Sequence, residues 1–176
     1  WTIMGPIPKR STEFGQVPTS WADGTYQWLN YLSKKDYPVI KNPSSSFLWT
    51  ANSRIVGGEM YKKLGDGGYA LGARAQQIRD NLSALTKADE QALLDVGLDT
   101  RALFLDRWHK LATKTLTHID NLNHSELSKV TMLLADENLS ATTNSVAYRL
   151  VRQFRLNTIN YITAPLTNWL TEQDEH

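Results

Sequence analysis

The residues of this sequence best suited to chemistry are an asparagine and an arginine separated by a glycine-rich stretch. Asn52 follows the apolar run Phe47–Ala51, and Arg74 follows the glycine-rich residues Gly65–Tyr69. A carboxamide N–H can donate to an oxygen that carries negative charge, and a guanidinium stays protonated and can orient polar neighbours. Considered singly, Asn52 is more often a turn residue and Arg74 a surface residue of a helix. The motifs around them change this balance.

Other groups that could carry chemistry give weaker patterns. The sequence has no cysteine, which excludes disulfides, thiolate metal sites and a cysteine nucleophile. It has no G-x-S-x-G turn that would expose a serine nucleophile. The four histidines show no metal-ligand spacing on one helix face, so we expect surface or helix-edge positions for His109, His118, His124 and His176.

The glycine-rich stretch Gly65–Tyr69 lacks the lysine and the hydroxyl residue of a phosphate-binding loop. Glycine readily adopts a positive φ, so a tight connection is the first interpretation of these residues. A loop that closes over a site is the alternative.

Composition places the chain among globular proteins without a strong overall field. It has 176 residues, 41% of them apolar, which is enough for one domain or slightly more. The formal net charge is +1, from 19 basic and 18 acidic residues. A balanced charge gives no general attraction to nucleic acid or anionic lipid, so we expect neither as a partner. No run of about 18 apolar residues occurs, so no membrane span is predicted, and an export signal, if one exists, would lie upstream.

Prolines divide the chain into two parts. Five of the 6 prolines fall in the first quarter, where they favour short strands and loops that carry tryptophans at intervals. The run Phe47–Ala51 predicts a buried strand that ends at Asn52. We therefore predict a strand and loop segment over residues 1–71 and a helical region over residues 72–176.

Apolar residues recur at helical spacing from Gly72 onward. Capping residues indicate where the individual helices begin, because their side chains can accept the free N–H groups of a first turn. The expected starts are marked by Thr86 with Asp89, by Asp99, and by Asn123 with Glu126.

Two residues should end helices. Gly97 is expected to end the helix that begins near residue 86. The last long helix, over about Ser145 to Ile162, should stop before Pro165, because the residue before a proline avoids the helical conformation. The candidate core residues of the helical region are Trp108, Leu111, Leu133, Leu150 and Phe154.

Short motifs occur in a fixed order over nearly the whole chain. They are Gly5–Arg10, Trp28, Asp36–Pro38, Asn42–Pro43, Thr50–Arg54, Gly72–Ala75, Gln77–Arg79, Leu98–Ala102 and Ser145–Arg152. In their order and spacing, the chain resembles an interior part of the β-chain of the penicillin acylase (penicillin amidase) family. These amidohydrolases use an N-terminal nucleophile (Ntn hydrolases).

The resemblance implies that the parent enzyme cleaves an amide with the hydroxyl of an N-terminal serine, whose own α-amine acts as the base. Asn52 matches the family asparagine that donates to the oxyanion, and Arg74 matches an arginine near the nucleophile. No candidate nucleophile stands at Trp1. The resemblance therefore implies a fragment that supplies accessory catalytic groups and is inactive alone.

The family fold implies an α+β chain. Short strands and proline-rich loops would belong to a four-layer αββα core, followed by four or five helices. The family further implies a periplasmic or otherwise exported protein. Its partners would be the rest of the parent acylase, that is the α-chain and the remaining β-chain, and a small N-acyl substrate such as a β-lactam side chain or an acyl homoserine lactone.

No cofactor is expected in this segment. Some family members bind a structural Ca²⁺ through an aspartate where this chain has Lys63. Glu59 and Asp66 lie nearby, but Ca²⁺ needs about six or more oxygen ligands and the segment supplies few. Structural Ca²⁺ in the parent enzyme is left open and has no support from these residues.

An alternative function belongs to a different class, a non-catalytic helical binding or scaffold module that keeps the family's framework without its chemistry. The two functions differ in structure. In an acylase fragment, Asn52 faces a cleft with Arg74 close by, and the strand that bears Asn52 has an unpaired edge or an exposed apolar face where the missing sheet belongs. In a module, the chain is closed and self-sufficient.

Overall fold

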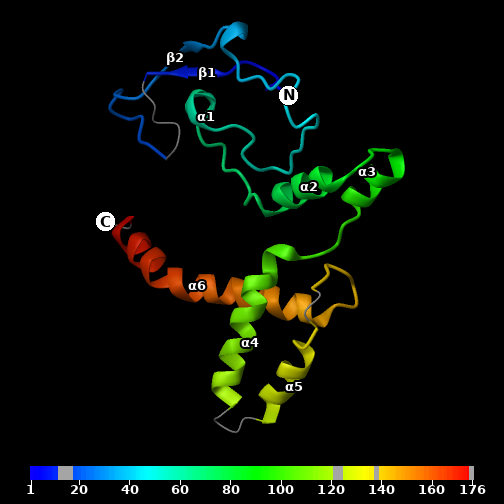
Figure 1. Ribbon diagram of the computed structural model, residues 1–176. Helices are drawn as coiled ribbons and strands as arrows, with labels where there is room; N and C mark the ends of the chain where they lie inside the picture. The colour runs from blue at the N-terminus through cyan, green and yellow to red at the C-terminus, as the bar shows by residue number, and fades with distance from the viewer. Residues whose placement is uncertain (12–17, 121–124, 137–138, 175–176) are drawn as a thin grey trace. The chain divides into compact units, whose positions relative to one another are not determined.

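A computed structural model of the chain describes residues 1–11, 18–120, 125–136 and 139–174 (Figure 1). The chain divides into two compact units, Trp1–Gly97 and Leu98–His176. In its described part, the first unit holds a two-stranded sheet and three α-helices, and the second holds three α-helices. The predicted α+β class is confirmed. The predicted division at residues 71 and 72, between strands with loops and helices, stays a prediction.

The sheet of the first unit consists of β1 (Pro8–Arg10) and β2 (Trp28–Tyr31), paired antiparallel. Pro8 stands opposite Tyr31, and a bulge shifts the register between Lys9 and Arg10. Proline is tolerated at the first position of a strand, where a missing N–H costs little. The prediction of short strands in the proline-rich part of the chain is confirmed.

The chain before β1 is held against the segment after β2. The terminal ammonium of Trp1 donates to the Ile40 carbonyl at 2.7 Å, and the Ile40 N–H donates to the Trp1 carbonyl at 2.9 Å. Ile7 and Pro38, one from each segment, are buried. The hydrogen bonds therefore tie the start of the chain to the segment after β2.

The run Phe47–Ala51 is not a strand, so this part of the sequence prediction is wrong. It lies between two residues with positive φ, Ser46 at 63° and Asn52 at 59°, which turn the backbone at each end. Exposure alternates along the run as in extended chain, but no described backbone segment pairs with it. A strand requires a partner for its N–H and C=O groups, which an apolar run does not provide.

Three helices follow in the first unit: α1 (Gly58–Leu64), α2 (Ala73–Ala84) and α3 (Glu90–Gly97). The helices predicted after Gly72 and up to Gly97 are confirmed by α2 and α3. The residue that caps α3 is Asp89 rather than Thr86, because Asp89 Oδ1 accepts the Ala92 N–H at 3.0 Å.

α1 was not expected from the sequence, although its local signals are present. Glu59 and Lys62, three residues apart, form an ion pair at 3.0 Å. Gly65 ends the helix with a φ of 74°, and its N–H donates to the Tyr61 carbonyl at 2.8 Å. An acidic first turn, a basic last turn and a following glycine could together have predicted this short helix.

The second unit packs the 3₁₀ turn η2 (Leu103–Leu105) and the helices α4 (Asp106–Asp120), α5 (Ser125–Leu133) and α6 (Val146–Asp174) around one apolar core (Figure 1). α4 contacts both α5 and α6. The helical periodicity predicted for this region is confirmed. The buried core residues are Leu105, Ala112, Leu134, Leu139, Ala147 and Val151.

Three of the five candidate core residues are confirmed. Trp108, Leu150 and Phe154 pack against the buried cluster, and the rings of Trp108 and Phe154 meet edge to face with centroids 6.4 Å apart. The prediction of Leu111 and Leu133 as core residues is wrong, since these residues are 45% and 46% exposed. Periodicity gives the spacing of a helix but leaves the angular position of its buried face uncertain by about one residue.

The histidine prediction is wrong at one position. His109 is only 8% exposed, and its Nε2 lies 2.7 Å from the Leu134 carbonyl. A carbonyl only accepts, so Nε2 carries the proton and His109 is a satisfied core residue. His118 is exposed as expected. His124 and His176 lie outside the described residues, as does Asn123 of the second capping pattern.

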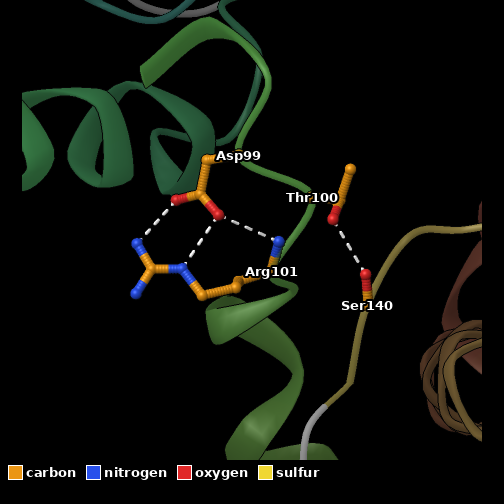
Figure 2. Close-up of polar contacts among 4 residues, drawn as sticks. All are labelled: Asp99, Thr100, Arg101 and Ser140. Carbon is orange, nitrogen blue, oxygen red and sulfur yellow. Dashed lines mark hydrogen bonds and ion pairs between the residues drawn. The ribbon is translucent and has the colours of Figure 1, made fainter. Parts of the chain in front are cut away.

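Asp99 does not cap a helix, contrary to the prediction. Its carboxylate instead accepts from Arg101, with Nε to Oδ1 and Nη2 to Oδ2 both 2.8 Å and the backbone N–H to Oδ1 3.1 Å (Figure 2). This hydrogen bonding, with the attraction of the carboxylate, raises the pKa of the Arg101 guanidinium above its ordinary value. The hydroxyls of Thr100 and Ser140 lie 2.9 Å apart, so the turn joins the start of the unit to the segment before α6.

α6 continues through Pro165, where the sequence predicted an end. Proline has no N–H for the carbonyl of Tyr161, but the surface there is open to water, because Tyr161 is 84% exposed. Threonine hydroxyls add bonds to carbonyls one turn earlier, such as Thr163 to Ile159 at 2.9 Å. Figure 1 shows α6 bending along its C-terminal part. Although α6 has 29 residues, no described helix is long and apolar enough to cross a membrane.

The core position of Val151 gives a direct test of this packing. Val151 is completely buried, so Val151→Ala should lower the free energy of unfolding by about 2 kcal/mol through lost apolar burial and the cavity left behind. Ile162 on the same helix is 69% exposed, and Ile162→Ala should change the free energy of unfolding by less than about 0.5 kcal/mol. Urea unfolding of the chain, followed by circular dichroism, measures both. Equal losses would contradict the assigned core.

Candidate functional site

Asn52 lies where the loop after α1 returns to the apolar run that precedes it. The loop begins at Gly65 and turns again at Gly68, whose φ is 69° and whose N–H donates to Asp66 Oδ1 at 2.9 Å. It reaches Asn52 through a hydrogen bond of 2.9 Å from the Ala70 N–H to the Asn52 carbonyl. The glycines therefore supply the tight connection that their sequence predicted.

Arg74, in the first turn of α2, extends to the same residue. Its Nη2 donates to Asn52 Oδ1 at 2.5 Å and to the Ala51 carbonyl at 3.1 Å. One guanidinium nitrogen thus holds a side-chain oxygen and a main-chain oxygen of adjacent residues. Both Asn52 and Arg74 are exposed. The structure brings together the two residues that the sequence selected, while their catalytic roles stay predictions.

This contact fixes the direction of the Asn52 carboxamide. A guanidinium has donors and no acceptor, so the amide atom that faces it must be the oxygen. The amide nitrogen Nδ2 then points away from Arg74, and it makes no hydrogen bond with any residue that the structure describes. The arrangement presents two N–H donors to solvent beside a permanent positive charge.

The backbone of Asn52 is left-handed, with a φ of 59°. Asparagine adopts this conformation more readily than alanine or a β-branched residue. Asn42, also exposed, has a φ of 49° and shows the same preference in the same unit. Position 52 therefore favours asparagine for its backbone as well as for its side chain.

The chain just before Asn52 has unpaired backbone groups. Leu48, Trp49 and Thr50 make no backbone hydrogen bond with a described residue, and Leu48 is 47% exposed. Unpaired backbone next to an exposed apolar side chain is what a neighbouring strand would cover. The expected strand edge is absent because the run is not a strand, so the choice between an acylase fragment and a closed module stays a prediction.

Arg74 is an unusual residue for the start of a helix. α2 has no acidic residue in its first turn, and Gly72 provides no side-chain cap. The helix dipole places partial positive charge at this end, so an exposed cation there is disfavoured by about 0.3–1 kcal/mol. The two oxygens supplied by Ala51 and Asn52 offset this repulsion, so local helix stability alone does not account for an arginine at this position.

Comparison with known proteins assigns the family. The family model described as penicillin amidase matches residues 1–175. The chain belongs to the penicillin amidase family. Residues 1–175 include the whole of the Asn52 and Arg74 site.

Similar relatives include three proteins named acyl-homoserine lactone acylase QuiP. The protein from Pseudomonas fluorescens Pf-5 is 26% identical over 111 residues, which cover 63% of this chain and 14% of the relative. The protein from Pseudomonas aeruginosa PAO1 is 29% identical over 105 residues, which cover 60% of this chain and 12% of the relative. The protein from Pseudomonas fluorescens Pf0-1 is 26% identical over 158 residues, which cover 84% of this chain and 19% of the relative. The chain thus spans less than a fifth of the length of these relatives, and no solved structure gives a significant match.

The chain has a lysine, Lys63, at the position where a calcium-binding aspartate was considered. The ammonium of Lys63 donates to the Asp36 carbonyl at 3.3 Å. Glu59 forms its ion pair with Lys62, and Asp66 accepts from the loop backbone. In the part of the chain that the structure describes, no group of three or more acidic or histidine side chains could hold a metal ion.

Two features near the candidate site, a backbone contact and a shifted pKa, were not foreseen. The Ala51 carbonyl that binds Arg74 left no signal, because a backbone atom is common to every residue type. Tyr69, which follows the loop glycines, has a pKa raised above 10.0, mainly by partial burial and further by the Asp66 carboxylate, while Arg54 lowers it. The phenol is therefore protonated near neutral pH and can donate a hydrogen bond.

The left-handed backbone at position 52 predicts a difference between two truncations. Both Asn52→Ala and Asn52→Gly remove the bond to Arg74, but only alanine is strained at a φ of 59°. Asn52→Ala should therefore be less stable than Asn52→Gly by about 1 kcal/mol. Arg74→Ala should cost about 1 kcal/mol or less, since the bond is exposed. Urea midpoints of the three variants measure these differences, and equal stability of the two Asn52 variants would contradict the assigned backbone.

Proposed function

We propose that this chain forms part of an acylase that hydrolyses the amide bond of an N-acyl compound, and that it supplies the oxyanion donor Asn52 and the orienting residue Arg74. The single observation that supports this proposal is the hydrogen bond between these two side chains, which directs Nδ2 of Asn52 outward. The family assignment gives the reaction class. Three relatives carry acyl-homoserine lactone acylase in their names, so an acyl homoserine lactone is the proposed substrate class, with a β-lactam side chain as the other member of the N-acyl group.

The reaction requires a nucleophile from elsewhere in the parent protein. In the proposed Ntn mechanism, the hydroxyl of an N-terminal serine attacks the amide carbon while its α-amine accepts the proton, and the amine product leaves with a proton from the same group. Water then releases the carboxylic acid from the acyl-enzyme. Negative charge develops on the carbonyl oxygen in both tetrahedral intermediates.

Asn52 would act on that charge. A carboxamide N–H about 3 Å from the developing oxyanion can lower the barrier by about 3 kcal/mol, because the donor is already oriented before charge appears. The Arg74 guanidinium supplies the orientation by holding Oδ1. Its positive charge would also favour the neutral form of a nearby α-amine, which is the form that accepts a proton.

The rest of the parent acylase is the proposed partner of α6. Large apolar residues lie along one face of its C-terminal half: Ile159, Ile162, Leu166, Trp169 and Leu170 are between 38% and 69% exposed. Their spacing of three and four residues gives a continuous stripe. A stripe of this size is normally covered in a stable protein. The relatives are much longer than this chain, and the proposed cover is the remainder of the α- and β-chains. Export to the periplasm is part of the same proposal.

Kinetics of the full-length protein test the role of Asn52. Asn52→Gly should lower kcat for an acyl homoserine lactone by about two to three orders of magnitude with little change in KM, because the lost bond forms in the transition state. Asn42→Gly is the matched control, since Asn42 has the same residue type, exposure and left-handed backbone, and it should leave kcat unchanged. The isolated 176-residue chain should be inactive. An unchanged kcat in Asn52→Gly, or hydrolysis by the isolated chain, would contradict the proposal.

The stripe on α6 predicts different outcomes in the chain and in the parent. In the isolated chain, Ile162→Asp should change the free energy of unfolding by less than about 0.5 kcal/mol, because Ile162 is 69% exposed. In the full-length protein it should cost about 2 kcal/mol or more, since the carboxylate would be buried against the partner surface. Asn160→Asp, an exposed polar position off the stripe, is the control. Thermal unfolding of both forms measures the difference, and the same small effect in both would exclude a covered α6.

A further inference from the structure

The first unit contains a cavity of about 370 Å³ whose wall is strongly basic. Its lining comes from β1, from the chain just after β2, and from α1. The charged and polar residues around it are Lys9, Arg10, Ser11, Glu59, Lys62 and Lys63. Neither Asn52 nor Arg74 lines it, so this cavity is separate from the proposed oxyanion site.

The wall of this basic cavity carries four cationic side chains and one carboxylate, a formal charge of +3. The whole chain has a net charge of only +1, so the positive charge is locally concentrated. The bulged strand β1 brings Lys9 and Arg10 to one side, and the last turn of α1 brings Lys62 and Lys63. Like charges in a shared hollow repel one another, and a bound anion would relieve that repulsion.

The cations are only partly neutralised by the protein. Lys62 pairs with Glu59 at 3.0 Å, and Lys63 donates to a neutral acceptor, the Asp36 carbonyl, at 3.3 Å. The half-buried Arg10 has no ion pair or side-chain hydrogen bond with the residues that the structure describes. A guanidinium at the wall of a cavity therefore keeps its five donors for another acceptor.

The pKa of a neighbouring carboxyl group agrees with a positive electrostatic field around the cavity. The pKa of the Asp36 carboxyl is held below its ordinary value, first by the hydrogen bond from the Ser33 hydroxyl and further by the ammonium groups of Lys63, Lys35 and Lys9. Two of these three lysines belong to the cavity wall. The same ammonium groups would stabilise an anion that enters the cavity.

We propose that the basic cavity binds a small polyanion, a compound with two or more negative charges borne by phosphate or carboxylate groups. Arginine presents a planar fork that bonds two oxygens of one such group, and the lysines add point charges around it. The volume lies at the lower end of the range for small-molecule pockets, which limits the ligand to a compact one. Two or more negative charges are needed to match the charge of the wall.

This site differs in chemistry from the proposed acylase function. The amide bond of an N-acyl substrate is neutral and is met by one oriented carboxamide, whereas the basic cavity selects charge. Binding of a polyanion would stabilise the folded first unit by mass action, independently of turnover. Failure of the acylase proposal would therefore leave the cavity proposal intact, and the reverse also holds.

Isothermal titration of the full-length protein with pyrophosphate, citrate and acetate at low ionic strength tests the proposal. Pyrophosphate or citrate should bind at one site at least tenfold more tightly than acetate, and affinity should fall as salt is added. The tighter of the two polyanions identifies phosphate or carboxylate as the source of charge. Lack of binding by both, or acetate bound as tightly as either, would overturn the proposal.

Charge-removing variants locate the binding. Arg10→Gln should lower the affinity for the tighter-binding polyanion by about tenfold or more, because it removes a charge-assisted hydrogen bond. Lys62→Gln should weaken it by about threefold, since its ammonium is shared with Glu59 and screened by water. Lys87→Gln, a lysine whose side chain is 82% exposed and does not line the cavity, should leave affinity unchanged. Equal affinities of Arg10→Gln, Lys62→Gln and Lys87→Gln would overturn the assignment to this cavity, and Lys62→Gln preserves the test if Arg10→Gln does not fold.

Discussion

The candidate site depends on one constraint, that a guanidinium can donate hydrogen bonds but cannot accept them. Because Arg74 holds Oδ1 of Asn52, the amide nitrogen has a fixed direction without any further contact. The same Arg74 nitrogen binds the Ala51 carbonyl, so the side chain and the backbone of the run are held at one point. A donor oriented in advance is what electrostatic stabilisation of an oxyanion requires, since reorientation during the reaction would cost free energy.

The surrounding first unit serves to keep these two residues in reach of each other. Gly65 and Gly68 take conformations with positive φ, and the loop they form is tied to Asn52 by the Ala70 N–H. α2 begins three residues later and carries Arg74 in its first turn, against the preference of the helix dipole. Arg74 is thus unfavourable for the start of α2 itself but makes a contact with another segment. A residue that breaks a local rule in this way is typical of functional sites.

Much of the fold could be predicted from the sequence because helix signals are local. The ends of α3 and the course of α4 follow from glycine, aspartate and apolar spacing within a few residues. Asp99 failed to mark a helix start because its carboxylate binds Arg101 instead of free N–H groups of a first turn. Pro165 failed to mark a helix end because the surface of α6 around it is open to water. The run Phe47–Ala51 failed as a strand because pairing requires a second segment. For the site, family motifs selected Asn52 and Arg74, but no sequence pattern could give the left-handed backbone or the role of the Ala51 carbonyl.

If Asn52 has the proposed role of oxyanion donor, its orientation is only one of the two conditions that this role requires. In water, a carboxamide gains little by binding an oxyanion, because solvent makes equivalent bonds and screens the charge. The same donor becomes effective in a dry, low-dielectric cavity. Asn52 and Arg74 are both exposed, and the apolar Leu48 near them is half exposed. The contact with Arg74 fixes the direction of the carboxamide. In the proposed role, exclusion of water would have to come from other parts of the parent protein. Orientation and desolvation are separable contributions, and only the first is encoded in these residues.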